Sequence, residues 1–178
     1  MDKKTLTLVE NYSKSLVDVA VEHNLIHEIR EDLTALLKIF QSTDLASSLS
    51  HEGISQSEKA ALVSQLQEGS HIFVNNFLEV IKQNEREAFL EAILSSAMEK
   101  LSVASNEFSL EIQVADSLSD EQKNRLKAVA ERKFAISVGQ VKEVINPELI
   151  GGFILKANNK IIDTSIKSQL QQLKMNLK

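Results

Sequence analysis

The apolar positions in the first hundred residues recur every three to four residues, which is the spacing of amphipathic helices. In the first such segment, residues 5–22, the apolar side chains cover roughly half of the helix circumference, more than the ~100° stripe of an ordinary surface helix. The pattern predicts six helices, over residues 5–22, 25–41, 43–50, 55–69, 71–83 and 86–105.

Local signals mark several ends of these helices. Ser55 and Glu58 have the spacing of a capping box, which opens the fourth helix. Either Ser42 or Thr43 can cap the third helix, and Gly69 ends the fourth. Because the links between the helices are short, we expect the six to form a compact bundle.

The period of the pattern changes near residue 106. Residues 108–114 alternate apolar and polar side chains, as in a strand with one buried face, and a second capping box at Ser119 and Gln122 opens a helix to about Phe134. The other predicted elements are strands over 141–145, 152–157 and 160–163, with an Asn158-Asn159 turn, and a helix from Thr164. We therefore expect a mainly α protein, with a six-helix bundle over residues 1–105 and a small α+β domain over 106–178.

The composition narrows the class of protein. The chain of 178 residues is 43% apolar and 25% charged, as in folded globular proteins, and has no Cys for disulfides or thiolate ligands. Residues 1–105 carry a net charge of −7 and residues 106–178 carry +2, which indicates two parts with different partners. Neither part has the dense basic stripe of a nucleic-acid-binding protein. The longest run without a polar side chain, residues 149–155, is too short to cross a bilayer, so we expect no direct membrane insertion.

The candidates for chemistry are weak. His23 and His27 have the spacing of a metal pair on a helix, but the predicted helix breaks at Asn24 and no H-E-x-x-H frame surrounds them, so we interpret them as ordinary surface histidines. Gly151-Gly152 lacks the remainder of a phosphate-binding loop and suits the tight start of a strand. The acidic residues of the Glu85-Arg86-Glu87 segment are typical of a helix start. We therefore predict no catalytic residue, no metal site and no cofactor.

The sequence favours binding surfaces instead. The helices at 5–22 and 71–83 have more apolar surface than one core contact uses, so a groove between them could receive a partner helix; alternatively, both are simply buried on all sides. The last helix has an apolar stripe, with Lys167, Lys174 and Lys178 on its other face, so it could seat an acidic helical partner or cover the small sheet. The predicted groove residues are Tyr12, Leu16, Val19, Phe73, Phe77 and Ile81, and those of the last helix are Ile166, Leu170 and Leu173, followed by Leu177.

The tail carries a more specific signature. The segment from Gly151 to Leu170 reads GGFILKANNKIIDTSIKSQL: a Gly pair, an apolar strand ending in a basic residue, a tight turn, an apolar pair, Asp, and a helix with basic residues and Leu. It resembles the C-terminal signature of the delta subunit of bacterial F-type ATP synthase, the equivalent of the mitochondrial oligomycin-sensitivity-conferring protein. The Tyr12-Ser13-Lys14 start, the link at residues 83–86 and the total length also match this family.

Some positions depart from the family pattern. Gly is usual there at Asn158 or Asn159 and at Thr164, and Arg is common at Lys167 and Gln169. Gly is also frequent at Glu85, and Arg-Pro often stands at Glu10-Asn11. Asn and Thr still suit a turn and a cap, so the departures concern contacts with partners rather than the fold.

The resemblance implies a role that needs no active site. It implies a stator subunit, one copy per complex, peripheral on the cytoplasmic face of the cell membrane. The bundle would bind the N-terminal helix of an alpha subunit in its groove, and the tail would bind the b-subunit stalk, so that the head does not turn with the central shaft and proton flow drives ATP synthesis. The alternatives are an RNA- or ribosome-associated binding protein, whose affinity would fall steeply with salt, and a small cytosolic enzyme, which would show turnover.

Overall fold

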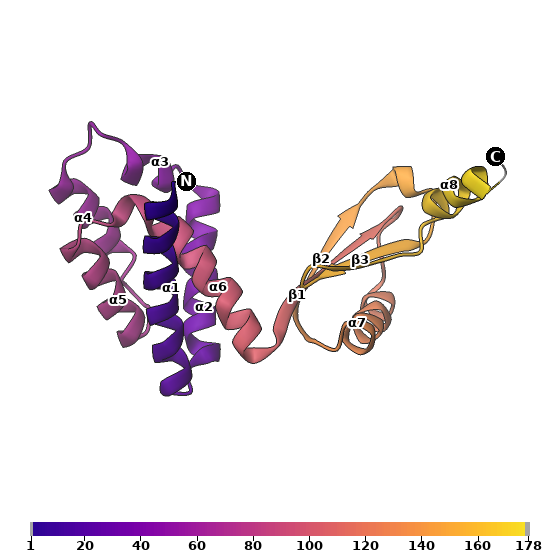
Figure 1. The fold of residues 1–178 in the computed structure, drawn as a ribbon, viewed down its shortest axis with the longest axis horizontal. Coiled ribbons are helices and arrows are strands. Elements are labelled where there is room, and N and C mark those ends of the chain that lie inside the picture. Colours follow the sequence, from indigo (N-terminus) through magenta and orange to yellow (C-terminus); the bar gives the residue numbers. More distant parts are fainter. Residues whose placement is uncertain (1, 177–178) are drawn as a thin grey trace. The chain divides into compact units, whose positions relative to one another are not determined.

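The computed structural model describes residues 2–176 and divides the chain into two compact units, Met1–Ser105 and Asn106–Lys178. The first unit is helical throughout, and the second combines helices with one sheet (Figure 1). The predicted fold class, mainly α with a small α+β part at the C-terminal end, is confirmed.

The first unit is a bundle of six α-helices with one 3₁₀ turn. Its elements are α1 (Lys3–Glu22), α2 (Ile26–Ser42), α3 (Leu45–Ser50), α4 (Gln56–Gln65), α5 (Ile72–Gln83), η1 (Glu87–Phe89) and α6 (Leu90–Ser105). The Ser55–Glu58 capping box is formed in both directions. The predicted end of the fourth helix was too late, because α4 stops at Gln65 and a turn leads to Gly69, which has a φ of 86°.

Two predicted details of helix starts differ from the structure. The N-cap residue of α3 is Asp44, although Thr43 Oγ1 does accept a hydrogen bond from the Leu45 N–H at 3.4 Å. The predicted helix at 86–105 opens as the 3₁₀ turn η1 before α6. In that turn Glu87 is buried, and the Gln56 side chain donates a 2.7 Å hydrogen bond to its carboxylate.

The core of the bundle lies where α1, α2 and α6 pack together and is closed by α5. Polar contacts join the helices around it: Ser96 donates a 3.0 Å hydrogen bond to buried Ser13, and Lys100 pairs with Glu10 at 2.8 Å. Arg30 of α2 donates to the carbonyl of Leu101 and so holds the last turn of α6. The contacts of Ser13 and Glu10 with α6 fix which face of α1 is turned inward.

The second unit is a four-stranded mixed sheet with helices. Its elements are β1 (Glu107–Val114), α7 (Asp120–Phe134), β2 (Ser137–Ile145), η2 (Pro147–Leu149), β3 (Phe153–Ala157), β4 (Lys160–Asp163) and α8 (Ile166–Asn176). The strand order is β2-β1-β3-β4, with β1 and β2 parallel and the other pairs antiparallel. The crossover through α7 makes the parallel pairing feasible, because parallel neighbours need a long connection.

The predicted Asn158-Asn159 turn and the Ser119–Gln122 capping box are both confirmed. Asn158 and Asn159 have φ values of 48° and 56°, as a two-residue hairpin turn requires. Ser119 and Gln122 bond reciprocally at the start of α7. The predicted strand at 141–145 was too short, because β2 begins at Ser137 and pairs from there with β1.

One face of this sheet is covered by α7. Alternate residues of β1 are buried there with residues of β3 and α7; they include Leu110, Ile112, Leu155, Ala130 and Phe134. The residues between them on β1 point to the opposite face and stay partly or fully exposed. The sheet therefore has a closed apolar face and an open mixed one.

Candidate partner-binding surfaces

The six predicted groove residues of the bundle do not share one environment. Leu16 and Phe77 are 2% and 9% exposed, and Ile81 is fully buried, so these three belong to the core and offer no surface to a partner. This corrects their sequence-based assignment: the apolar arcs of the two helices are wide partly because they serve the core. The other three, Tyr12, Val19 and Phe73, are half-buried and lie at the margin of the core.

Phe73 is held in place at the start of α5 by two imidazole rings. Its ring centroid lies 4.5 Å from that of His23, at the end of α1, and 5.6 Å from that of His71. His71 is the N-cap of α5, and its backbone N–H donates a 2.6 Å hydrogen bond to Asp32 of α2. The ends of α1 and α5 therefore meet at Phe73, and His71 ties that end of α5 to α2.

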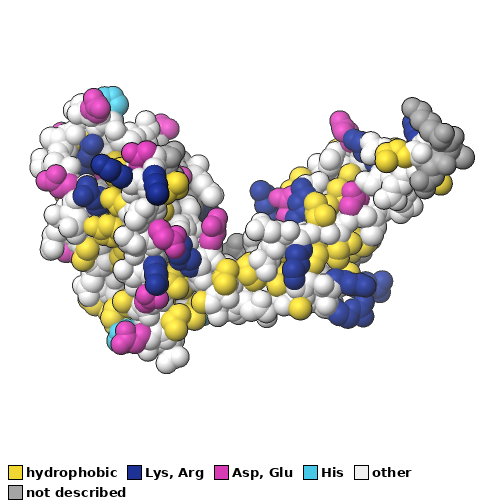
Figure 2. All heavy atoms as spheres, in the orientation of Figure 1, with side chains coloured by type: hydrophobic (Ala, Val, Ile, Leu, Met, Phe, Trp, Pro, Cys, Tyr) yellow, Lys and Arg dark blue, Asp and Glu magenta, His cyan; other side chains and the backbone are white. Residues whose placement is uncertain are grey.

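Further apolar residues around these helices are exposed, and the sequence pattern did not single them out. Ile72 and Val80 of α5 and Leu6 and Val21 of α1 are exposed. A signal was present, because seven of the twelve residues of α5 are apolar, more than one core contact uses. On the face of the bundle seen in Figure 2, apolar side chains lie among charges of both signs.

The stripe predicted on the last helix is exposed. Ile166, Leu170 and Leu173 are 42%, 46% and 57% exposed, while Leu177 lies outside the described residues. The first turn of α8 is nevertheless anchored, because the Ile166 N–H donates to the carbonyl of Gly151 and Lys167 pairs with Glu148 at 2.8 Å. The helix is thus fixed at its start while its apolar stripe remains available.

Asp163 is the main side-chain anchor of that first turn. Its carboxylate accepts hydrogen bonds from the Ser165 N–H at 2.9 Å and the Ser168 hydroxyl at 2.6 Å. These bonds, that from Ser168 foremost, hold the pKa of Asp163 below its ordinary value. The carboxylate acts here as a helix-start acceptor rather than as an acid or base.

Glu143 ties β2 to α7 in a similar way. It accepts from Lys123 and from the Leu118 N–H, each at 2.7 Å, and the hydrogen bond from Lys123 is the main cause of its lowered pKa. Hydrogen-bonded carboxylates whose pKa is lowered are ionised at neutral pH, so they stabilise a fold and do not suit proton transfer there.

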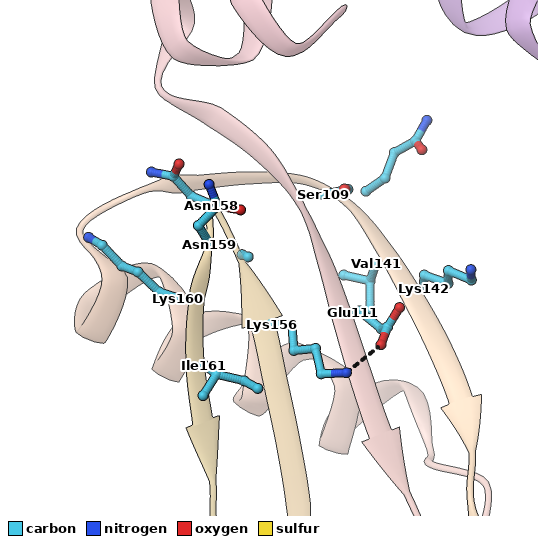
Figure 3. A pocket seen from close by; sticks show the side chains of 11 residues that line it. Ser109, Glu111, Val141, Lys142, Lys156, Asn158, Asn159, Lys160 and Ile161 are labelled. Atoms are coloured by element: carbon cyan, nitrogen blue, oxygen red, sulfur yellow. Dashed lines mark ion pairs between the residues drawn. The ribbon is translucent and has the colours of Figure 1, made fainter. Parts of the chain in front are cut away.

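A shallow hollow of about 670 Å³ lies on the second unit (Figure 3). Residues from all four strands and the turn line it: Ser109, Glu111, Gln140, Val141, Lys142, Lys156, Ala157, Asn158, Asn159, Lys160 and Ile161. Within it Lys156 forms an ion pair with Glu111 at 3.5 Å.

The residues considered for chemistry are not assembled into a site. Among residues 2–176 no group of three His, Cys, Asp or Glu side chains could hold a metal ion, and His27 pairs with Glu31 at 3.4 Å. Gly152 has a φ of 77°, and a Cβ there would lie 2.4 Å from the carbonyl oxygen of Thr164, so the glycine serves a close backbone approach. Among residues 2–176 no helix is long and apolar enough to span a membrane.

Comparison with known proteins agrees with the resemblance in the tail. The model of the ATP synthase delta (OSCP) subunit family matches residues 8–177. The chain is 48% identical to ATP synthase subunit delta of Streptococcus equinus and 43% identical to that of Streptococcus pyogenes serotype M1, in both cases over the full length of both chains. Its fold matches a chain of the Toxoplasma gondii mitochondrial ATP synthase hexamer, with a TM-score of 0.74 and 16% identity over 96% of this chain and 97% of that one. The protein belongs to the ATP synthase delta (OSCP) subunit family.

Proposed function

We propose that this chain is a non-catalytic peripheral stalk subunit of F-type ATP synthase that clamps the catalytic head to the stalk. The observation that carries this is the full-length match to curated relatives named ATP synthase subunit delta. The family assignment gives no support to the RNA-binding or enzyme alternatives.

The bundle is the part that we assign to the head, through the N-terminal helix of an alpha subunit. Tyr12, Val19 and Phe73 lie half-buried on α1 and α5, where a partner helix would cover them. The exposed Val80 of α5 extends the same apolar surface. Leu16, Phe77 and Ile81 support this surface from the core and are not assigned a contact.

The second unit is the part that we assign to the b subunit of the stalk. The exposed stripe of Ile166, Leu170 and Leu173 on α8 has the spacing that one helix presents to another. Its anchored first turn lets a load on the helix pass into the sheet, because Ile166 is bonded to the segment that precedes β3.

The mechanism is mechanical. Rotation of a central shaft exerts torque on the head, and a subunit bound to both head and stalk prevents the head from turning with it. Such work requires broad and stable interfaces, and association of that kind depends on buried anchors rather than reactive groups. We place the protein, in one copy per complex, on the cytoplasmic side of the membrane as a peripheral subunit.

Size-exclusion chromatography of the full chain with ATP synthase head lacking its own delta subunit tests the proposal. We expect co-elution at one copy per head, which is lost when the N-terminal segment of the alpha subunits is removed. The double substitution Leu170→Ser with Leu173→Ser should leave head binding intact and weaken binding to the soluble part of the b subunit. Separate elution of chain and head at micromolar concentration would refute the proposed role.

A further inference from the structure

The Phe73 end of the bundle rests on a histidine that is also a helix cap. His71 is the N-cap of α5, and its Nδ1 accepts a hydrogen bond from the Phe73 N–H at 3.4 Å. The imidazole also stacks with the Phe73 ring, at an interplanar angle of 15° and a centroid distance of 5.6 Å. One side chain therefore satisfies the backbone of residue 73 and packs against its ring.

The cap is itself held from α2. The Asp32 carboxylate accepts a hydrogen bond from the backbone N–H of His71 at 2.6 Å. Asp32 thus fixes the backbone of the cap, whereas the contacts with Phe73 fix the orientation of the imidazole.

The cap can form in only one protonation state of His71. A backbone N–H donates to a ring nitrogen that carries a lone pair, so Nδ1 must be without a proton. In the charged imidazole both ring nitrogens are donors, and Nδ1–H would then face the Phe73 N–H. The added charge would also lie at the positive end of the α5 dipole, where cations are unfavourable. Imidazole is the side chain whose charge ordinarily changes between about pH 5 and 8, so acid in this range acts on the cap.

The charges around the cap draw a protonated ring away from Phe73. Asp32 is the carboxylate bonded to the cap, and an imidazolium that turned toward it would leave the Phe73 N–H. The other ionisable groups near this end are exposed, and among the described residues none bonds to His71: Glu22 and His23 of α1, Glu28 of α2, and Glu68 in the turn before α5. Salt screens exposed charges, so Asp32 dominates.

We infer that His71 is the positioning residue of Phe73 in the head-binding surface, and that it holds this ring for the partner helix only while its imidazole is neutral. The inference rests on the proposed function and adds regulation to the same site, because the hold on the alpha-subunit helix weakens in acid. Two losses cause the weakening: α5 loses its cap, and Phe73 loses the stacked ring that preorganises it.

Calorimetry of the full chain with a peptide of the alpha-subunit N-terminal segment, at about pH 7.5 and about pH 5.5, tests the inference. The variant is His71→Asn, since Asn caps a helix but gains no proton in this range. The matched control is His27→Asn, which removes an exposed imidazole of α2 that pairs with Glu31 instead. The increase in Kd on acidification should be about three- to tenfold larger for the unchanged chain and for His27→Asn than for His71→Asn. Titration of the peptide is common to all three proteins and cancels in this comparison.

Amide hydrogen exchange at Phe73 gives a second readout that needs no partner. The protection factor of this N–H should fall at the lower pH in the unchanged chain and stay constant in His71→Asn. Circular dichroism at both pH values checks that each variant is folded.

Each other outcome is decisive. An equal pH dependence in the three proteins, or none in the unchanged chain, would overturn the inference. If His23→Asn removed the dependence and His71→Asn kept it, the imidazole of α1 would be the responsive group and the inference would be wrong. If the peptide bound at neither pH, the proposed head role would fail, and the protection of the Phe73 N–H would still decide whether His71 holds it only when neutral.

Discussion

Replacing Phe73 by Ala separates partner binding from folding in the bundle. The change removes a half-buried ring and its contacts with His23 and His71, at 4.5 Å and 5.6 Å. A fully buried Phe costs about 3–5 kcal/mol on truncation to Ala, so this half-buried ring should cost about 2 kcal/mol of stability. The cap of α5 persists, because the imidazole of His71 accepts from the backbone N–H of residue 73.

Binding should suffer more than that modest loss of stability indicates. Truncating an aromatic anchor at an interface costs about 2 kcal/mol or more, which corresponds to an about 30-fold higher Kd. Calorimetry with a peptide of the alpha-subunit N-terminal segment gives the Kd, and urea denaturation followed by circular dichroism gives the stability.

Ile81→Ala is the matched control. Ile81 lies on the same helix but is fully buried, so its truncation should cost about 2–5 kcal/mol of stability and leave the surface unchanged. The folded fraction of this variant should bind the peptide within about threefold of the original affinity. The reasoning would be refuted if Phe73→Ala bound normally, or if both variants lost affinity in parallel.

Two further predictions concern the second unit and its turns. Gly152→Ala should destabilise the unit by more than about 2 kcal/mol, because the new Cβ would lie 2.4 Å from the carbonyl oxygen of Thr164 and the residue would also have to adopt a positive φ. Gly69→Ala is the control: nothing lies near its Cβ, so it should show only the cost of the positive φ, about 1 kcal/mol. Urea melts of both variants check this, and equal losses would contradict the backbone clash. The pKa of Asp163 is lower in the folded state than in the unfolded state. Its bonds to Ser165 and Ser168 therefore contribute their full stability at pH values above the pKa of the unfolded state, and this stability is lost as the pH falls through the pKa of the folded state. Amide hydrogen exchange should therefore show that the start of α8 opens in acid. In Asp163→Asn the start of α8 should be open at every pH, so its exchange should no longer depend on pH in this way. An unchanged pH profile in this variant would refute the role of Asp163.

The sequence predicted best those elements whose signals are local. The capping boxes at Ser55 and Ser119 each depend on a partner three residues away, so the chain position alone identifies both groups. The turn at Asn158-Asn159 is similar, because the residues that adopt positive φ are themselves the signal. These features need no knowledge of the tertiary structure.

The start of β2 could not be predicted because its reason is distant in the sequence. Ser137 pairs with Glu107, thirty residues earlier in the chain, and its N–H donates to the Asn106 carbonyl. The residues between Ser137 and Val141 show no apolar alternation, and the register shifts between Phe108 and Leu110. Only the parallel neighbour makes this segment a strand.

The burial of the predicted groove residues could not be derived from the sequence, because a helical wheel shows which residues share an arc but not which neighbour each one meets. On α1 the inner part of the arc is defined by the hydrogen bond between Ser13 and Ser96 of α6, a polar contact that no apolar pattern contains. Leu16 falls on the α6 side of the arc and is buried, whereas Tyr12 and Val19 fall toward its edge.

The two proposed joints of the clamp differ in their physical chemistry, and this sets which one yields first. The head joint rests on Tyr12, Val19 and Phe73, whose apolar contacts are not weakened by moderate salt. The stalk joint includes α8, whose first turn is held in part by the exposed ion pair of Lys167 and Glu148, and exposed charges act only within a Debye length of about 8 Å at physiological ionic strength. Torque passes through both joints in series, so the weaker one limits the load. As ionic strength rises, the chain should therefore release the stalk while it still holds the head.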